Sequence, residues 1–91
     1  MEKSVFTADY RVLLELLVET RKSAGVRQVD LAERLGTTQS YVSKIEQGDL
    51  RLDVIQLRAV CLALNTGLRE FVFELEKRLA RGGRRKRRRD G

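Results

Sequence analysis

The stretch Gln28–Gln47, QVDLAERLGTTQSYVSKIEQ, decides the fold of this chain of 91 residues. Its apolar residues form two groups at helical spacing, namely Val29, Leu31, Ala32 and Leu35 before a break and Val42 and Ile45 after it. Gly36 lies at the break, where glycine can adopt the left-handed conformation that a sharp turn requires. The pattern predicts two short helices, joined by a tight turn, that share one buried side.

Two helices arranged in this way form a helix-turn-helix pattern. The second helix would direct its polar side chains outward, and these are Gln39, Ser40, Ser43 and Lys44. All of them can hydrogen-bond to base edges in the major groove of DNA or to phosphates. For each residue taken alone, a solvated helix face is the alternative interpretation.

The residues around the turn belong to a longer motif. It comprises Gln28, Leu31-Ala32, Leu35-Gly36, Thr37-Thr38-Gln39-Ser40, Val42-Ser43, Ile45-Glu46 and Gly48. This motif resembles the lambda-repressor-like family, also called the Cro/CI or XRE-type helix-turn-helix domains, and the resemblance extends from about Leu13 to Val72. It implies an all-α fold, a five-helix bundle that binds double-stranded DNA. A helical module with a purely structural hairpin is the alternative.

The second helix is expected to begin near Gln28, which the resemblance places on the DNA backbone. Arg27 stands where the family usually has Ser or Thr, so this helix lacks a side-chain N-cap, and Asp30 in its first turn offsets part of the loss. Arg27 is also a candidate for a phosphate contact. Arg51, in the loop after the third helix, is another, although an exposed loop arginine is nearly as good an interpretation.

The third helix is expected over Thr38–Gln47, with Thr37 or Thr38 as its cap. Gln39 has the geometry for a bidentate pairing with adenine. Tyr41 is ambiguous, because its ring suits a thymine methyl group and its hydroxyl suits a phosphate. The predicted DNA-binding residues are Arg27, Gln28, Thr37, Thr38, Gln39, Ser40, Tyr41, Ser43, Lys44 and Arg51.

A first helix is predicted over about Ala8–Ala24, after a frayed segment 1–7 in which Thr7 is the expected N-cap. The resemblance implies that Arg21 of this helix pairs with Glu46 of the third helix. Such a pair would be partly buried and would tie the first helix to the third. A solvated surface arginine is the alternative.

Asp53 and Gln56 have the spacing of a capping box that starts a fourth helix, with a core stripe of Leu57, Val60, Cys61 and Leu64. A break at Asn65-Thr66-Gly67 leads to a fifth helix over about Leu68–Ala80, which is longer than a minimal domain needs. Its apolar residues predict a dimer interface formed by Phe71, Phe73, Leu75 and Leu79. A homodimer would place two third helices in successive major grooves, about 34 Å apart.

The positive charge of the chain is confined to its last residues. Residues 1–80 contain twelve Lys or Arg and twelve Asp or Glu, whereas residues 81–91 contain seven Lys or Arg and one Asp, which accounts for the net charge of +6. We therefore predict a neutral domain over 8–80 and a disordered basic tail over 81–91. The tail suits nonspecific binding to DNA phosphates, binding to RNA, or solubility.

Composition argues against several other classes of protein. The chain has no histidine, one cysteine and no proline, which favours an all-α protein without an intrachain disulfide. We find no catalytic residue, no cofactor site and no metal-ligand cluster, so we predict that the protein is not an enzyme. Cys61 is expected to be a small buried apolar group. No segment predicts a membrane span or a signal peptide, and the expected location is the cytoplasm.

The function predicted from the sequence is a sequence-specific regulator of transcription, a repressor that binds double-stranded DNA as a homodimer. Two alternatives have a protein partner. One is an antitoxin that binds both DNA and a toxin, and the other is an adaptor whose fold binds protein while its basic tail binds nucleic acid.

Overall fold

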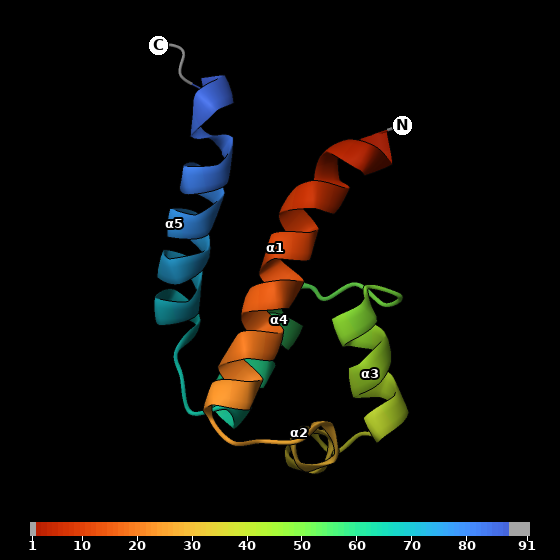
Figure 1. Ribbon diagram of the computed structural model, residues 1–91. Helices are drawn as coiled ribbons and strands as arrows, with labels where there is room; N and C mark the ends of the chain where they lie inside the picture. Colours follow the sequence, from red (N-terminus) through yellow and green to blue (C-terminus); the bar gives the residue numbers. More distant parts are fainter. Residues whose placement is uncertain (1, 88–91) are drawn as a thin grey trace.

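The computed structural model of the protein describes residues 2–87, and its side chains over residues 8–82. The described chain consists of five helices without a strand, α1 Glu2–Ser23, α2 Gln28–Leu35, α3 Gln39–Gln47, α4 Val54–Ala63 and α5 Leu68–Arg87 (Figure 1). The predicted all-α fold, a five-helix bundle, is therefore confirmed. No described helix is both long enough and apolar enough to cross a membrane.

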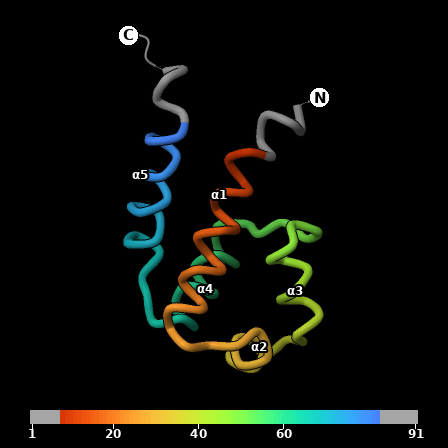
Figure 2. Tube along the Cα trace, viewed as in Figure 1, coloured from red at the N-terminus to blue at the C-terminus, as the bar shows by residue number. Residues whose placement is uncertain are grey.

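The two long helices, α1 and α5, pack side by side, and α3 lies on the opposite side of α1 from α5 (Figures 1 and 2). The short helix α2 crosses one end of the bundle, where it contacts α3 and α4. Helix α4 also packs on α5, and α3 is held against the bundle chiefly by α1 and α2. The other side of α3 remains at the surface of the molecule.

The core draws side chains from all five helices. Leu17 of α1, Leu31 of α2, Val42 of α3 and Cys61 of α4 are its largest fully buried side chains. Phe71 contributes the side chain from α5. The apolar stripes predicted for the third and fourth helices are confirmed, whereas Val29 on α2 is 41% exposed and lies outside the core.

Local sequence signals account for the boundaries of α2, α3 and α4. Gly36 has φ 72°, and in this left-handed conformation its N–H donates to the carbonyl of Glu33 at 3.2 Å. Thr38, rather than Thr37, caps α3 by accepting a hydrogen bond from the N–H of Tyr41 at 3.1 Å. The capping box of α4 is present, with Asp53 Oδ1 accepting from the N–H of Gln56 at 2.7 Å and Gln56 Oε1 from the N–H of Asp53 at 2.8 Å.

The outer ends of α1 and α5 differ from the prediction. Helix α1 begins at Glu2, so Thr7 lies inside the helix and is not its N-cap. Helix α5 continues to Arg87 instead of ending at Ala80, so the tail is helical over Arg81–Arg87. Arginine and lysine have helix propensities close to that of leucine, and they extend the helix despite the cost of the glycine pair in this segment. Residues 88–91 of the predicted tail lie outside the described residues.

The predicted dimer interface on α5 needs one correction. Phe71 is only 4% exposed and belongs to the core, because this face of α5 packs against the rest of the bundle. Leu75 and Leu79 are half-buried, and Phe73 is 67% exposed. Arg78 further fixes α5 on α1, since its Nη2 donates to Glu19 Oε1 at 2.9 Å. Phe71 is therefore unavailable for contact with a second copy.

Candidate nucleic-acid interface

The outer side of α3 presents a polar face to solvent. Val42 and Ile45 are 1% and 3% exposed and attach the helix to the core. On the opposite side, Gln39, Ser40 and Lys44 are exposed and Ser43 is half-buried. Their polar groups are thus available to a ligand that approaches from outside the bundle.

The prediction missed one member of this face. Gln47 is exposed, and its Nε2 donates to Ser43 Oγ at 3.2 Å. Its position four residues after Ser43 and seven after Ser40 places it on the same side of the helix. That spacing is visible in the sequence and was sufficient to include Gln47.

An ion pair beneath the polar face ties α3 to α1. Arg21 Nε donates to Glu46 Oε2 at 2.6 Å and Arg21 Nη2 donates to Glu46 Oε1 at 3.1 Å. The two side chains are 9% and 6% exposed, and Arg21 Nη1 also donates to the carbonyl of Val26 at 2.9 Å. A bidentate pair of this kind fixes orientation as well as distance. It therefore sets the position of α3 on the bundle.

Gln28 extends this network to the surface. Its Nε2 donates to Glu46 Oε1 at 2.8 Å, and its Oε1 accepts from Gln39 Nε2 at 3.4 Å. The chain Arg21–Glu46–Gln28–Gln39 thus runs from the buried side of α1 to the exposed start of α3. Gln39 is consequently held at the same corner of the molecule as the N-terminus of α2.

Arg27 lies at the same corner, with its charge matched by a neighbour. Its side chain is 77% exposed, and Nε and Nη2 each donate to the Asp30 carboxylate at 2.9 Å. The backbone N–H of Arg27 donates to the same carboxylate at 3.0 Å. Hydrogen bonds from the Arg27 side chain, then from its backbone, lower the pKa of Asp30 to about 2. A guanidinium cannot accept a hydrogen bond, so the absence of a side-chain N-cap on α2 is confirmed.

The remaining predicted residues lie on other sides of α3. Tyr41 is half-buried and its hydroxyl accepts from Gln56 Nε2 at 3.3 Å, which turns it toward α4. Thr37 lines the same apolar groove as Tyr41. Arg51 lies with its guanidinium carbon 4.3 Å from the centre of the Tyr10 ring, beside α1. Thr37 and Tyr41 thus line a groove to which neither Gln28 nor Gln39 contributes, and Arg51 follows the C-terminal end of α3.

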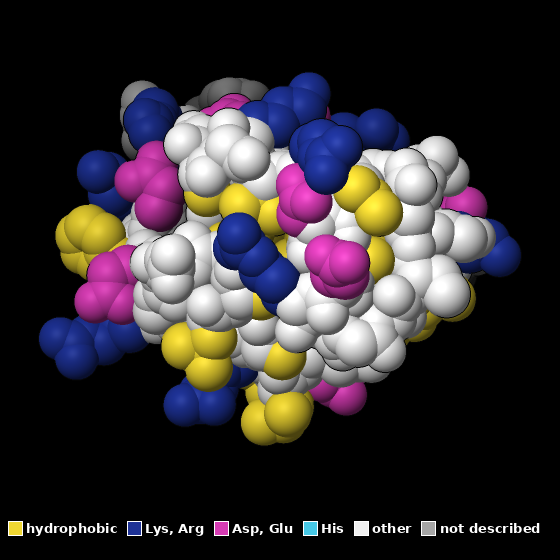
Figure 3. Space-filling model, turned by 90° about the horizontal axis from the view of Figure 1, so that it is seen from below, with side chains coloured by type: hydrophobic (Ala, Val, Ile, Leu, Met, Phe, Trp, Pro, Cys, Tyr) yellow, Lys and Arg dark blue, Asp and Glu magenta, His cyan; other side chains and the backbone are white. Residues whose placement is uncertain are grey.

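The surface charge does not by itself mark an interface. Figure 3 views the molecule from the end where α2 lies, and there Lys and Arg side chains alternate with Asp and Glu. This mixture agrees with the balanced charge of residues 1–80. The geometry of α3, not a field of one sign, distinguishes this surface.

Two observations bear on other chemistry. Among the residues that the structure describes, no group of three or more potential metal ligands is present. Cys61 is fully buried, and desolvation raises the pKa of its thiol to about 11. It is therefore a core residue without thiolate character at neutral pH.

A tight turn between two short helices, with an exposed polar face on the second, is the arrangement of a helix-turn-helix domain, the class in which the second helix enters the major groove of DNA. A helix-turn-helix family model matches residues 17–71. The chain belongs to this family, within its Cro/CI (XRE) type of DNA-binding regulators.

A solved structure supports the same assignment. The chain is similar to an XRE-family like protein from Pseudomonas syringae pv. tomato str. DC3000, with 42% identity and a TM-score of 0.78. The similarity covers 84% of this chain and 93% of that one. Among curated protein sequences, none matches this chain.

Proposed function

We propose that the protein is a transcriptional repressor that binds specific sites on double-stranded DNA as a homodimer, with α3 in the major groove. The observation that carries the proposal is the exposed polar face of α3, held in place from below by the Arg21–Glu46–Gln28 network. Nine residues give α3 a length of about 14 Å, which suits a major groove about 12 Å wide.

The contacts divide into two kinds. Gln39, Ser40, Ser43 and Lys44 read base edges, and Gln47 joins them on the same face. Gln28 and Arg27, at the N-terminus of α2, bind the phosphate backbone and set the register of the protein on the duplex. Gln28 also contacts Gln39. The contact of Gln28 with the DNA backbone therefore also fixes the position of Gln39, the side chain that reads the first base.

Repression follows from binding alone. A protein that covers the major groove over a promoter blocks RNA polymerase sterically, whereas activation requires a further surface that recruits the polymerase. Repression therefore requires only the DNA-binding face already described, and it is the simpler assignment.

Selection of bound sites from random duplex DNA tests the proposal. We expect the full chain to enrich one sequence, and Gln39→Ala to lose about tenfold in affinity for it, because a bidentate base contact contributes about 1–3 kcal/mol of discrimination. Ser23→Ala, an exposed residue at the end of α1, is the control and should bind like the wild type.

Two results would contradict the proposal. One is the enrichment of no sequence, which would favour an adaptor whose fold binds protein. The other is an unchanged preferred sequence and affinity in Gln39→Ala, which would remove α3 from the interface.

A further inference from the structure

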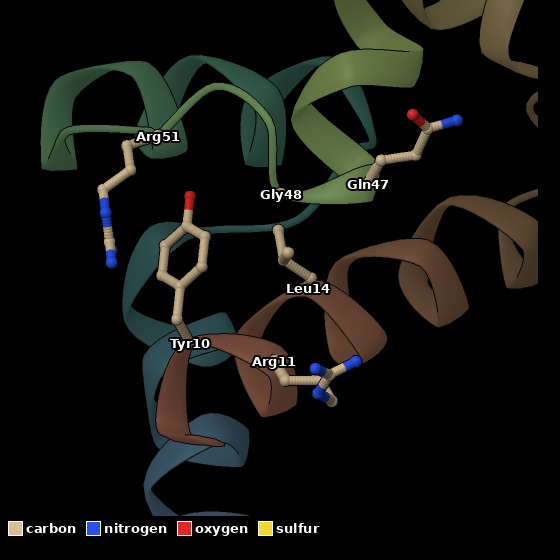
Figure 4. Close-up of a pocket in the computed structure, with 6 residues that line it drawn as sticks. All are labelled: Tyr10, Arg11, Leu14, Gln47, Gly48 and Arg51. Atoms are coloured by element: carbon tan, nitrogen blue, oxygen red, sulfur yellow. The ribbon is translucent and has the colours of Figure 1, made fainter. Parts of the chain in front are cut away.

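A hollow of about 180 Å³ lies between the N-terminal half of α1 and the turn that follows α3. Its lining consists of Tyr10, Arg11, Leu14, Gln47, Gly48 and Arg51 (Figure 4). The charged members of this lining are both arginines, and no carboxylate among the side chains of residues 8–82 lines it. The hollow therefore offers hydrogen-bond donors and positive charge to a ligand.

The hollow exists because α1 lies directly against the turn. A Cβ atom at Gly48 would come within 3.3 Å of Leu14 Cδ1, so glycine permits the close approach of this part of α1. The hydroxyl of Tyr10 accepts a hydrogen bond from the N–H of Leu52 at 3.0 Å. These contacts fix Arg11, on α1, relative to the C-terminal end of α3.

The two arginines are held on different elements. Arg51, in the loop after α3, lies over the Tyr10 ring, and this cation–π contact orients its guanidinium. Arg11 is exposed and points to the same side as Gln47 in Figure 4. Within the described side chains, Arg11 forms no ion pair. A guanidinium group can form paired hydrogen bonds with the oxygens of a phosphate, so the side chains of Arg11 and Arg51 are both suited to bind a phosphate.

The position of the hollow relates it to the polar face of α3. Gln47 lines the hollow and also donates to Ser43 on that face. If α3 enters the major groove, a strand of the duplex that passes the C-terminal end of this helix therefore comes close to the hollow. Arg11 also lines an adjoining groove, which contains Glu15, Glu19 and Glu46. Their charge repels phosphate, so the hollow that Arg11 shares with Arg51 is the more favourable side for an anion.

We propose that this hollow binds a phosphate of the DNA backbone, with Arg11 as a contact supplied by the extended first helix. The inference rests on the proposed function, because it assumes that α3 enters the major groove. Gln28 then holds the backbone at the start of α3 and Arg11 holds it at the end. Two anchors on the same flank of the helix fix its tilt in the groove.

The experiment measures the affinity of the full chain for its selected duplex between about 50 and 200 mM salt. It compares the wild type with Arg11→Gln and with Arg69→Gln, an equal loss of charge from an exposed residue on α5, across α1 from α3 (Figure 1). We expect the slope of log affinity against log salt to become shallower by about 0.9 in Arg11→Gln only. Between these two salt concentrations, the fold-loss of affinity should therefore be about 3.5 times smaller in Arg11→Gln than in the wild type.

The selected sequence should remain the same in Arg11→Gln, because phosphates carry no base identity. Equal slopes in Arg11→Gln and the wild type, or equal changes in the two variants, would overturn the inference while leaving the proposed function intact. If the wild type enriched no duplex at all, the proposed function would fail first and the inference would fall with it.

Discussion

Glu46 shows how much depends on one side chain in this fold. Its carboxylate accepts hydrogen bonds from two nitrogens of Arg21 and one of Gln28. It therefore joins three helices at a point only 6% exposed to solvent. The ion pair replaces hydration that both groups lose on folding, so the removal of one partner costs more than the pair contributes.

We expect Glu46→Gln to destabilise the protein by about 3–5 kcal/mol, because it leaves the Arg21 guanidinium buried without a counter-charge. The free energy of unfolding in urea measures this change. Glu33→Gln is the matched control, since Glu33 is exposed on α2 and forms no ion pair with a described side chain. A loss in Glu46→Gln no larger than in the control would show that the carboxylate does not hold α3 in place.

At the scale of helices, the accuracy of each predicted boundary depends on whether a local sequence signal marks it. Gly36 and Thr38 are local signals, and both boundaries of the turn agree with the structure. No proline or glycine stands before Ala8 to end a helix, and Thr7, the expected N-cap, lies inside α1, so the prediction placed the start of this helix too late. Boundaries that depend on helix propagation, rather than on caps, are difficult to predict from sequence.

The candidate site was likewise predicted only in part from the sequence. The spacing of α3 was enough to identify its exposed face, but not the partners of its residues. Tyr41 turns toward α4 because Gln56 lies there, and Arg51 turns toward α1 because Tyr10 lies there. Phe71 and Phe73 are two residues apart on one helix, and only packing against the bundle buries the first and exposes the second. These assignments require tertiary contacts that no local pattern contains.

A pair of glycine substitutions with opposite signs tests the turn. Gly36 has φ 72° with no atom near an added Cβ, so Gly36→Ala is opposed by backbone conformation alone and should destabilise by about 1–2 kcal/mol. Gly82, inside α5, also has free space but an ordinary helical backbone. Gly82→Ala should leave stability unchanged or raise it by up to about 1 kcal/mol. Thermal unfolding measures both, and a destabilised Gly82→Ala would contradict the helical extension of α5.

The whole molecule has dimensions that suit a dimer on DNA. Its principal extents are 45 × 28 × 20 Å. Two copies that touch along the longest axis, the middle axis or a direction between them therefore have centres about 28–45 Å apart. Successive major grooves on one side of B-DNA are about 34 Å apart, which lies within this range. A symmetric pair of copies of this size is therefore compatible with the proposed placement of two α3 helices in successive major grooves. In the proposed homodimer, the surface that joins the copies would lie outside the DNA-facing side.

Phe73 is the exposed aromatic residue on the predicted dimer surface, with Lys77 Nζ 5.7 Å from its ring centre. We expect the wild type to sediment as a dimer and Phe73→Asp as a monomer, because a buried charge without a partner opposes association. Ile55→Asp is the control, as Ile55 is 71% exposed on α4. Phe73→Asp should also weaken binding to a two-site duplex far more than to a single half-site. A dimer lost in Ile55→Asp but kept in Phe73→Asp would move the interface to α4, and a monomeric wild type, free and on DNA, would refute the dimer.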